Sequence, residues 1–111
     1  MINCYPFWEG SAVENSLDDL RKMYAVTGEN ALNKKIIITE TGWPSMGDKV
    51  HQAEPSTANA RKYFLQTQDW AQKEAVDLFY FSSFDETWKI KEEGSVGARW
   101  GIWDKDENLK Y

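Results

Sequence analysis

The chain has 111 residues and a formal net charge of −5, and its length allows one domain. Hydrophobic residues make up 41% and charged residues 28%, a balance that excludes collagen-like, disordered and disulfide-scaffold chains. The acidic balance argues against a nucleic-acid partner, which needs a basic face, and no apolar run approaches the roughly 20 residues of a membrane span.

The first part of the chain predicts a strand, a helix and a second strand. Residues 2–5 form a short candidate strand that Pro6 ends. Residues 11–14 have the form of a capping box, and apolar side chains then recur at helical spacing as far as Gly28, the expected end of the helix. Residues 35–39 include three consecutive isoleucines without polar alternation, which predicts a strand buried on both faces.

The second part repeats this rhythm. A loop rich in Gly, Pro and Ser follows the isoleucine strand, and residues 55–57 open a second helix. The stripe expected to face the core is Ala60, Tyr63, Phe64, Thr67, Trp70 and Ala71. Residues 77–84 predict another near-continuous apolar strand, and residues 90–111 a loop-rich tail with a candidate strand at 100–103.

Strands that alternate with amphipathic helices predict an α/β fold with parallel strands and right-handed crossovers. The repeat of about 35–40 residues is close to the βα unit of a (β/α)₈ barrel, and about three such units fit in this chain. The residues alone therefore leave two alternatives, a small open α/β sheet or part of a barrel.

Polar side chains gather at the predicted strand ends. The carboxyl ends of parallel strands lie on one side of a sheet, where α/β active sites form. At these ends the sequence places Asn3 and Tyr5, then Glu40, then Asp85 and Glu86. Three tryptophans follow them: Trp8, Trp43 and Trp88. Because carboxylates carry out glycoside hydrolysis and indoles stack on sugar rings, a carbohydrate site is one interpretation.

Each of these residues also has a plainer interpretation. Glu40 could be a surface glutamate, although Gly-Trp-Pro at 42–44 is not the composition of a solvated loop. The acids at 85–86 could cap a helix, Trp88 with Lys89 could cover the rim, and the tryptophans could form an aromatic core. The sequence has no metal-ligand spacing and no phosphate-binding glycine loop, so we expect no cofactor.

Four blocks resemble glycoside hydrolase family 17, the β-1,3-glucanases. Residues 37–45, Ile-Ile-Thr-Glu-Thr-Gly-Trp-Pro-Ser, resemble the family's nucleophile strand, and residues 84–89, Phe-Asp-Glu-Thr-Trp-Lys, resemble the segment after its last barrel strand. Residues 100–102 resemble the element that closes the domain, and residues 3–7 resemble the end of strand six. The blocks follow the family's order and cover nearly the whole chain.

The resemblance implies that residues 1–111 are one segment, the C-terminal part (about strands 6–8) of a (β/α)₈ TIM barrel. It implies a retaining hydrolase or transglycosylase of β-1,3-glucan, with Glu40 as nucleophile. The residues that it implies bind substrate are Asn3, Tyr5, Trp8, Trp43, Phe84, Glu86, Trp88 and Lys89. The Lys89 ammonium would favour the ionised nucleophile and offset Glu86. The family is commonly secreted or associated with the cell wall.

The chain departs from the family pattern in two places. The family's acid/base glutamate follows strand four and is absent from this segment, whereas a retaining glycosidase needs two carboxyl groups about 5–5.5 Å apart. Many members also carry a glutamate three residues before the aromatic that matches Trp100. Here that position is Gly97, and Glu92 or Glu93 could supply the carboxylate instead.

Four hypotheses follow from these observations. The leading one is the nucleophile-bearing part of a β-1,3-glucanase barrel, inactive or nearly so by itself. A second is a non-catalytic remnant that binds glucan through its aromatic rim. A third is one half of a split enzyme, completed by a partner chain that carries the N-terminal half of the barrel. The fourth, a structural α/β domain without a ligand, is disfavoured by the four family blocks.

Overall fold

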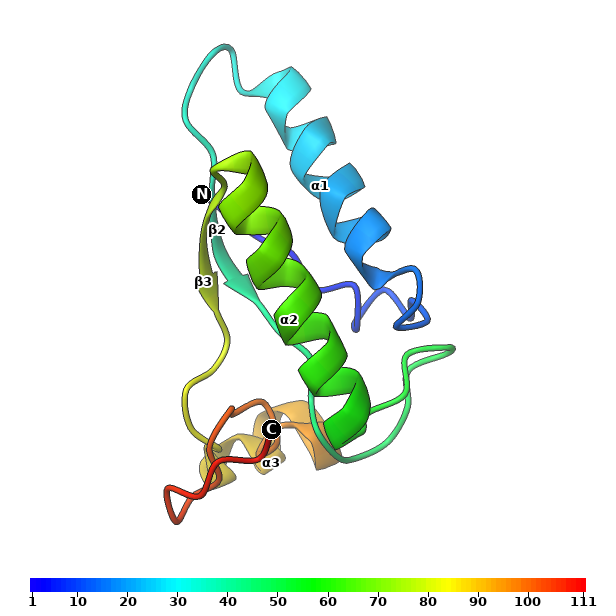
Figure 1. The fold of residues 1–111 in the computed structure, drawn as a ribbon. Coiled ribbons are helices and arrows are strands. Elements are labelled where there is room, and N and C mark those ends of the chain that lie inside the picture. The colour runs from blue at the N-terminus through cyan, green and yellow to red at the C-terminus, as the bar shows by residue number, and fades with distance from the viewer.

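The computed structural model describes residues 1–111 and contains a three-stranded parallel sheet with two long helices (Figure 1). The strands β1 (Ile2–Asn3), β2 (Ile37–Thr41) and β3 (Asp77–Tyr80) are paired in the order β1-β2-β3. Helix α1 (Ser16–Asn30) connects β1 to β2, and α2 (Thr57–Glu74) connects β2 to β3. The predicted β-α-β-α-β order is therefore confirmed. Figure 1 shows the helices side by side along the sheet.

The predicted capping box at the start of α1 is wrong. The hydroxyl of Ser11 donates a hydrogen bond to the Asp19 carboxylate, at 2.7 Å, instead of accepting one from the backbone of residue 14. The helix begins later, at Ser16, whose hydroxyl donates to the carbonyl of Val13 and closes the preceding turn. It also continues beyond Gly28, the expected end, as far as Asn30.

Helix α2 follows the sequence prediction closely. The Ser56 side chain caps it by accepting a hydrogen bond from the backbone N–H of Asn59, at 3.0 Å. The left-handed conformation of Ala75 ends it. Five residues of the predicted stripe are buried, namely Ala60, Tyr63, Thr67, Trp70 and Ala71. The amphipathic pattern therefore identified the face that packs on the core.

The core lies between the helices and the sheet. Ile38 of β2 and Leu20 of α1 are fully buried in it. The hydroxyls of Tyr63 and Thr41 are 2.6 Å apart and satisfy each other inside it. Beyond the carboxyl end of the sheet the core continues as an aromatic cluster, in which the rings of Phe7, Trp8, Trp43 and Trp100 lie 5.2–5.6 Å from their neighbours.

The strands differ from their predicted extents. β2 ends at Thr41, so that Glu40 lies within the strand and opposite Asn3 of β1. β3 is not buried on both faces, because its side chains alternate and Phe79 is 66% exposed. The candidate strand at 100–103 is reduced to single bridges that Trp103 makes with neighbouring segments. These local differences leave the layout of parallel strand ends unchanged.

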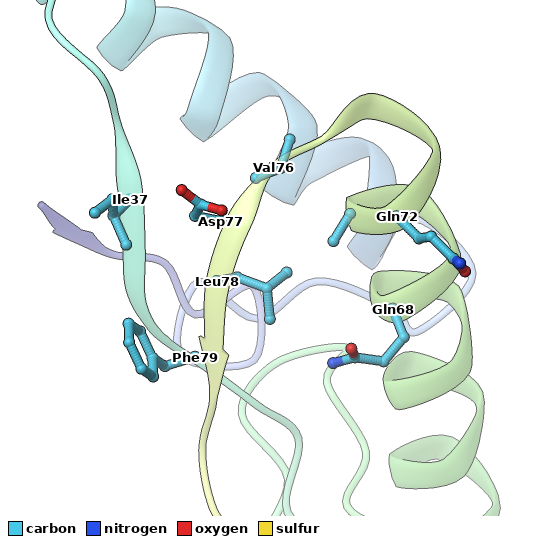
Figure 2. Close-up of a pocket in the computed structure, with 8 residues that line it drawn as sticks. Ile37, Gln68, Gln72, Val76, Asp77, Leu78 and Phe79 are labelled. Atoms are coloured by element: carbon cyan, nitrogen blue, oxygen red, sulfur yellow. The ribbon is translucent and has the colours of Figure 1, made fainter.

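The sheet is open at both edges. β1 and β3 each pair on one side only, and a hollow lies beside each of them. The hollow between β3 and α2 has a volume of about 520 Å³, and Figure 2 shows Gln68, Gln72 and Leu78 among the residues that line it. The three strands thus form an open sheet and not a closed barrel. Neither long helix is apolar enough to cross a membrane.

The close approach of β2 to the segment after β3 generates a stability prediction. A Cβ at Gly42 would overlap the carbonyl oxygen of Phe81, whereas one at Gly28 would meet only a methyl group, 3.6 Å away. We expect Gly42→Ala to lower the free energy of unfolding by about 1–3 kcal/mol, since backbone must move. Gly28→Ala should raise it by about 0.5–1 kcal/mol, because alanine favours a helix. Urea denaturation of both variants measures these changes, and equal stabilities would contradict the packing described.

Candidate active site

A hollow of about 240 Å³ lies where the carboxyl ends of the parallel strands meet the tail. The residues that line it are Tyr5, Trp8, Glu40, Phe81, Lys89, Glu93 and Trp100. The hollows beside the sheet edges are larger, but they lie along the flanks of the sheet. The strand-end hollow is the candidate active site because carboxylates, an ammonium group and aromatic rings converge there at the usual position for α/β proteins.

Glu40 is the acid that the sheet itself positions. Its backbone carbonyl accepts a hydrogen bond from Cys4, at 2.9 Å, which ties it to the segment leaving β1. One carboxylate oxygen, Oε2, accepts a hydrogen bond from the Tyr5 hydroxyl, at 3.0 Å. Burial raises the pKa of Tyr5, and the hydrogen bond to Glu40 raises it further. The phenol therefore stays protonated and remains a hydrogen-bond donor to the acid.

Lys89 provides the positive charge at the hollow. Its side chain is 13% exposed, and its ammonium lies 2.7 Å from the Glu86 carboxylate in an ion pair within the turn after β3. The same ammonium lies 4.0 Å from the centre of the Phe81 ring and 5.3 Å from that of Trp88. Glu86 thus forms an ion pair with Lys89 but does not itself line the hollow.

Trp100 and Glu93 form the side of the hollow that faces the tail. The Trp100 indole N–H donates a hydrogen bond to Glu93 Oε2, at 2.9 Å. The indole ring packs edge-on against Tyr5, with 5.4 Å between ring centres. The predicted site did not include Trp100, and Glu93 was only one of two alternatives, because the pattern of a loop-rich tail does not show which side chains point inward. Phe81 was missed because it belongs to an apolar run.

Trp43 does not reach the hollow, which corrects the prediction that it lines a substrate subsite. It is fully buried, and its ring packs between Phe7 and Tyr63. Its indole N–H donates to the backbone carbonyl of Glu54, at 3.0 Å. Its ring contacts and its indole N–H are both satisfied inside the core, so the indole does not reach the rim.

Four other predicted site residues also lie outside the hollow, namely Asn3, Phe84, Glu86 and Trp88. The Phe84 ring packs against Trp103, with 5.8 Å between ring centres, and it is 49% exposed. The Asn3 side chain accepts a hydrogen bond from the Thr39 hydroxyl, at 2.6 Å. Trp88 is 58% exposed beside Lys89, whereas Tyr5, Trp8, Glu40 and Lys89 come together in the hollow as the sequence suggested.

Asp85, the neighbour of Glu86, has a structural position. Its side chain is almost completely buried, and its Oδ1 accepts hydrogen bonds from the backbone of Gly101 and from the Lys110 ammonium, at 2.9 and 2.7 Å. These contacts bind the segment after β3 to the end of the chain. No group of three or more His, Cys, Asp or Glu side chains is arranged to hold a metal ion.

The raised pKa of Tyr5 predicts a loss of stability in alkali. An unfolded tyrosine ionises near pH 10, whereas the folded chain keeps this proton to higher pH, so stability is full below about pH 10 and falls above it. We expect Tyr5→Phe to make this fall smaller by about 1 kcal/mol at about pH 11. Urea unfolding between neutral and alkaline pH measures it, and an unchanged pH slope in the variant would contradict the burial of the phenol.

Comparison with known proteins places the chain in a family. Residues 1–101 match the family described as the BtgE/BtgC glycoside hydrolase domain. All of the chain aligns with glucan 1,3-β-glucosidases of Arthroderma benhamiae, at 32% identity, and of Saccharomyces cerevisiae, at 29%. The chain spans 40% and 38% of the lengths of these relatives, in their C-terminal part.

A solved structure agrees with these relatives. The chain superposes on the glycoside hydrolase family 17 β-1,3-glucanosyltransferase of Rhizomucor miehei with a TM-score of 0.90 and 34% identity, over 96% of this chain and 39% of that one. The resemblance to family 17 is therefore confirmed. The chain belongs to the BtgE/BtgC glycoside hydrolase domain family.

Proposed function

We propose that this chain carries the nucleophile part of the active site of a retaining enzyme that acts on β-1,3-glucan. The observation that supports it best is the position of Glu40, which lies at the carboxyl end of the central strand, bonded to the Tyr5 phenol and open to a hollow with aromatic walls. The names of the matched relatives, glucan 1,3-β-glucosidase and β-1,3-glucanosyltransferase, give the substrate class.

The geometry suits a nucleophilic carboxylate. Tyr5 occupies Oε2 of Glu40, and no other side chain hydrogen-bonds the carboxylate, so Oε1 is free to attack the anomeric carbon of a bound sugar. Attack forms a bond from this oxygen to the sugar and breaks the glycosidic bond, giving a covalent glycosyl-enzyme. The Lys89 ammonium, paired with Glu86, offsets negative charge in the hollow.

The remaining half of the reaction needs groups beyond these residues. The leaving oxygen must receive a proton from a second carboxyl group about 5–5.5 Å from the nucleophile. We propose that further βα units supply it and close the sheet into a (β/α)₈ barrel, of which β1, β2 and β3 are about strands 6–8. The unpaired edges of β1 and β3 and the 39% coverage of the glucanosyltransferase support this arrangement. The units could belong to the same polypeptide or to a partner chain.

This proposal is tested in two steps with laminarin, a β-1,3-glucan. The 111 residues by themselves should release no sugar at ordinary enzyme rates, since loss of acid–base assistance typically costs about 10²–10⁴-fold in rate. Co-expression with the N-terminal part of the Rhizomucor glucanosyltransferase should restore turnover. Ordinary turnover by the isolated chain would overturn the division of the site.

Substitution of the nucleophile tests its role in the restored enzyme. We expect Glu40→Gln to lower turnover of laminarin by at least about 10³-fold, because the amide cannot form the covalent intermediate. Glu29→Gln, at an exposed position on α1, is the matched control and should leave the rate unchanged. A Glu40→Gln variant as active as the control would show that another group is the nucleophile.

The exposed indoles favour a second candidate function, glucan binding without cleavage. Trp8 is 41% exposed at the hollow and Trp88 is 58% exposed beside it, so both rings are available to stack on sugar. Binding of laminarin that survives Glu40→Gln but is lost in Trp8→Ala, together with inactivity of the restored barrel, would favour this function. Trp43→Ala cannot serve here, because that indole belongs to the core.

A further inference from the structure

Glu93 brings a second carboxylate into the hollow that holds Glu40. It is the last residue of the short helix α3 (Ile90–Glu93), and its neighbour Glu92 is exposed and does not line the hollow. The indole N–H of Trp100 holds one of its oxygens, Oε2. Its other oxygen, Oε1, has no hydrogen-bond donor within the protein.

The backbone around Gly97 explains why the carboxylate comes from position 93. A Cβ at Gly97 would overlap the carbonyl oxygen of Lys89 and lie 2.7 Å from its carbonyl carbon and 3.1 Å from Glu93 Cβ. No side chain fits at position 97 in this backbone, so a glutamate there would displace the turn that carries Lys89. Glu93, four residues after Lys89, lines the hollow itself.

Glu40 and Glu93 are held in the same way. Each has one oxygen bonded to an aromatic donor, the phenol of Tyr5 or the indole of Trp100, and each has one oxygen free. Since Tyr5 and Trp100 also pack against each other, the two carboxylates are hydrogen-bonded to neighbouring aromatic side chains. The charge of Glu93 contributes to the raised pKa of Tyr5, after burial and Glu40, which places Glu93 within the electrostatic reach of the site.

A free carboxylate oxygen in a partly closed hollow is an acceptor for a hydroxyl donor. Hydrogen bonds to charged groups are stronger than those between neutral groups, and sugars present several hydroxyls around a ring that can lie on an indole. Resting on the proposed function, we propose that Glu93 is a substrate-binding residue whose Oε1 accepts a hydrogen bond from a hydroxyl of the glucose unit held at Glu40. Glu93 would select a polyhydroxylated ring and not form the covalent bond.

The experiment titrates the ¹⁵N-labelled 111-residue chain with laminaritriose and follows the indole N–H resonance of Trp100 by NMR. In the wild type this resonance should move on binding. The indole N–H donates to Oε2 of Glu93, and the sugar hydroxyl would bind Oε1 of the same carboxylate. Glu93→Ala should weaken binding of laminaritriose by about tenfold or more. Glu93→Gln keeps one acceptor oxygen, for Trp100, and places an NH₂ donor at the other position, so its affinity should fall between that of this variant and the wild type. Glu92→Gln, one residue away and exposed, is the matched control and should bind like the wild type.

Four outcomes test this inference separately from the proposed function. Equal binding by the wild type and both Glu93 variants would overturn the inference and leave the role of Glu40 untouched. If laminaritriose shifts no resonance in the wild type, the inference is wrong for this chain, whereas the role of Glu40 is decided by the laminarin assay of the restored enzyme. If Glu93→Ala weakens binding but its resonances also collapse into the narrow range of an unfolded chain, Glu93→Gln decides, since its amide oxygen can still accept from Trp100. Full affinity in a folded Glu93→Gln would count against a charged hydrogen bond.

Discussion

The parallel pairing of β2 with both of its neighbours is the constraint on which the rest of the structure depends. It sets Glu40 opposite Asn3, so that the chain leaving β1 places Tyr5 within hydrogen-bond distance of the acid. It also brings the segment after β3 across the same edge, where Phe81 and Lys89 complete the hollow. Because Tyr5 and Glu40 lie far apart in the sequence, only this register brings them together, and a shift in it would separate the phenol from the carboxylate.

The site is a balance of few charges against many aromatic rings. Glu86 pairs with the ammonium group of Lys89, which lies over the Phe81 ring. Glu40 and Glu93 line the same hollow as this ammonium group. Burial among rings strengthens each of these interactions relative to water, and it makes the orientation of every donor matter. Tyr5 and Trp100, which pack against each other, supply those donors, so the aromatic cluster both fills the core and orients the acids.

Some parts of this arrangement could be predicted from the sequence and others could not. The run of three isoleucines identified the central strand, and the periodic stripe of α2 identified the packed helix face, because buried positions select apolar side chains. The capping box failed because Ser11 has a competing partner, Asp19, one turn into the helix. Trp43 followed the acid in sequence but entered the core, since a pattern of residue types carries no information on which way an indole turns.

The sequence by itself determined the order of elements, the family and the identity of Glu40 as the acid of a strand end, because local periodicity and short motifs are properties of neighbouring residues. Only the tertiary structure decided which side chains share the hollow. In α3 it is Glu93 and not Glu92 that lines the hollow. The backbone at Gly97 lies so close to the Lys89 carbonyl that a side chain does not fit there. The packing of this tail against Tyr5 and beside Glu40, which are distant in the chain, decides which side chains share the hollow, and no local pattern records it.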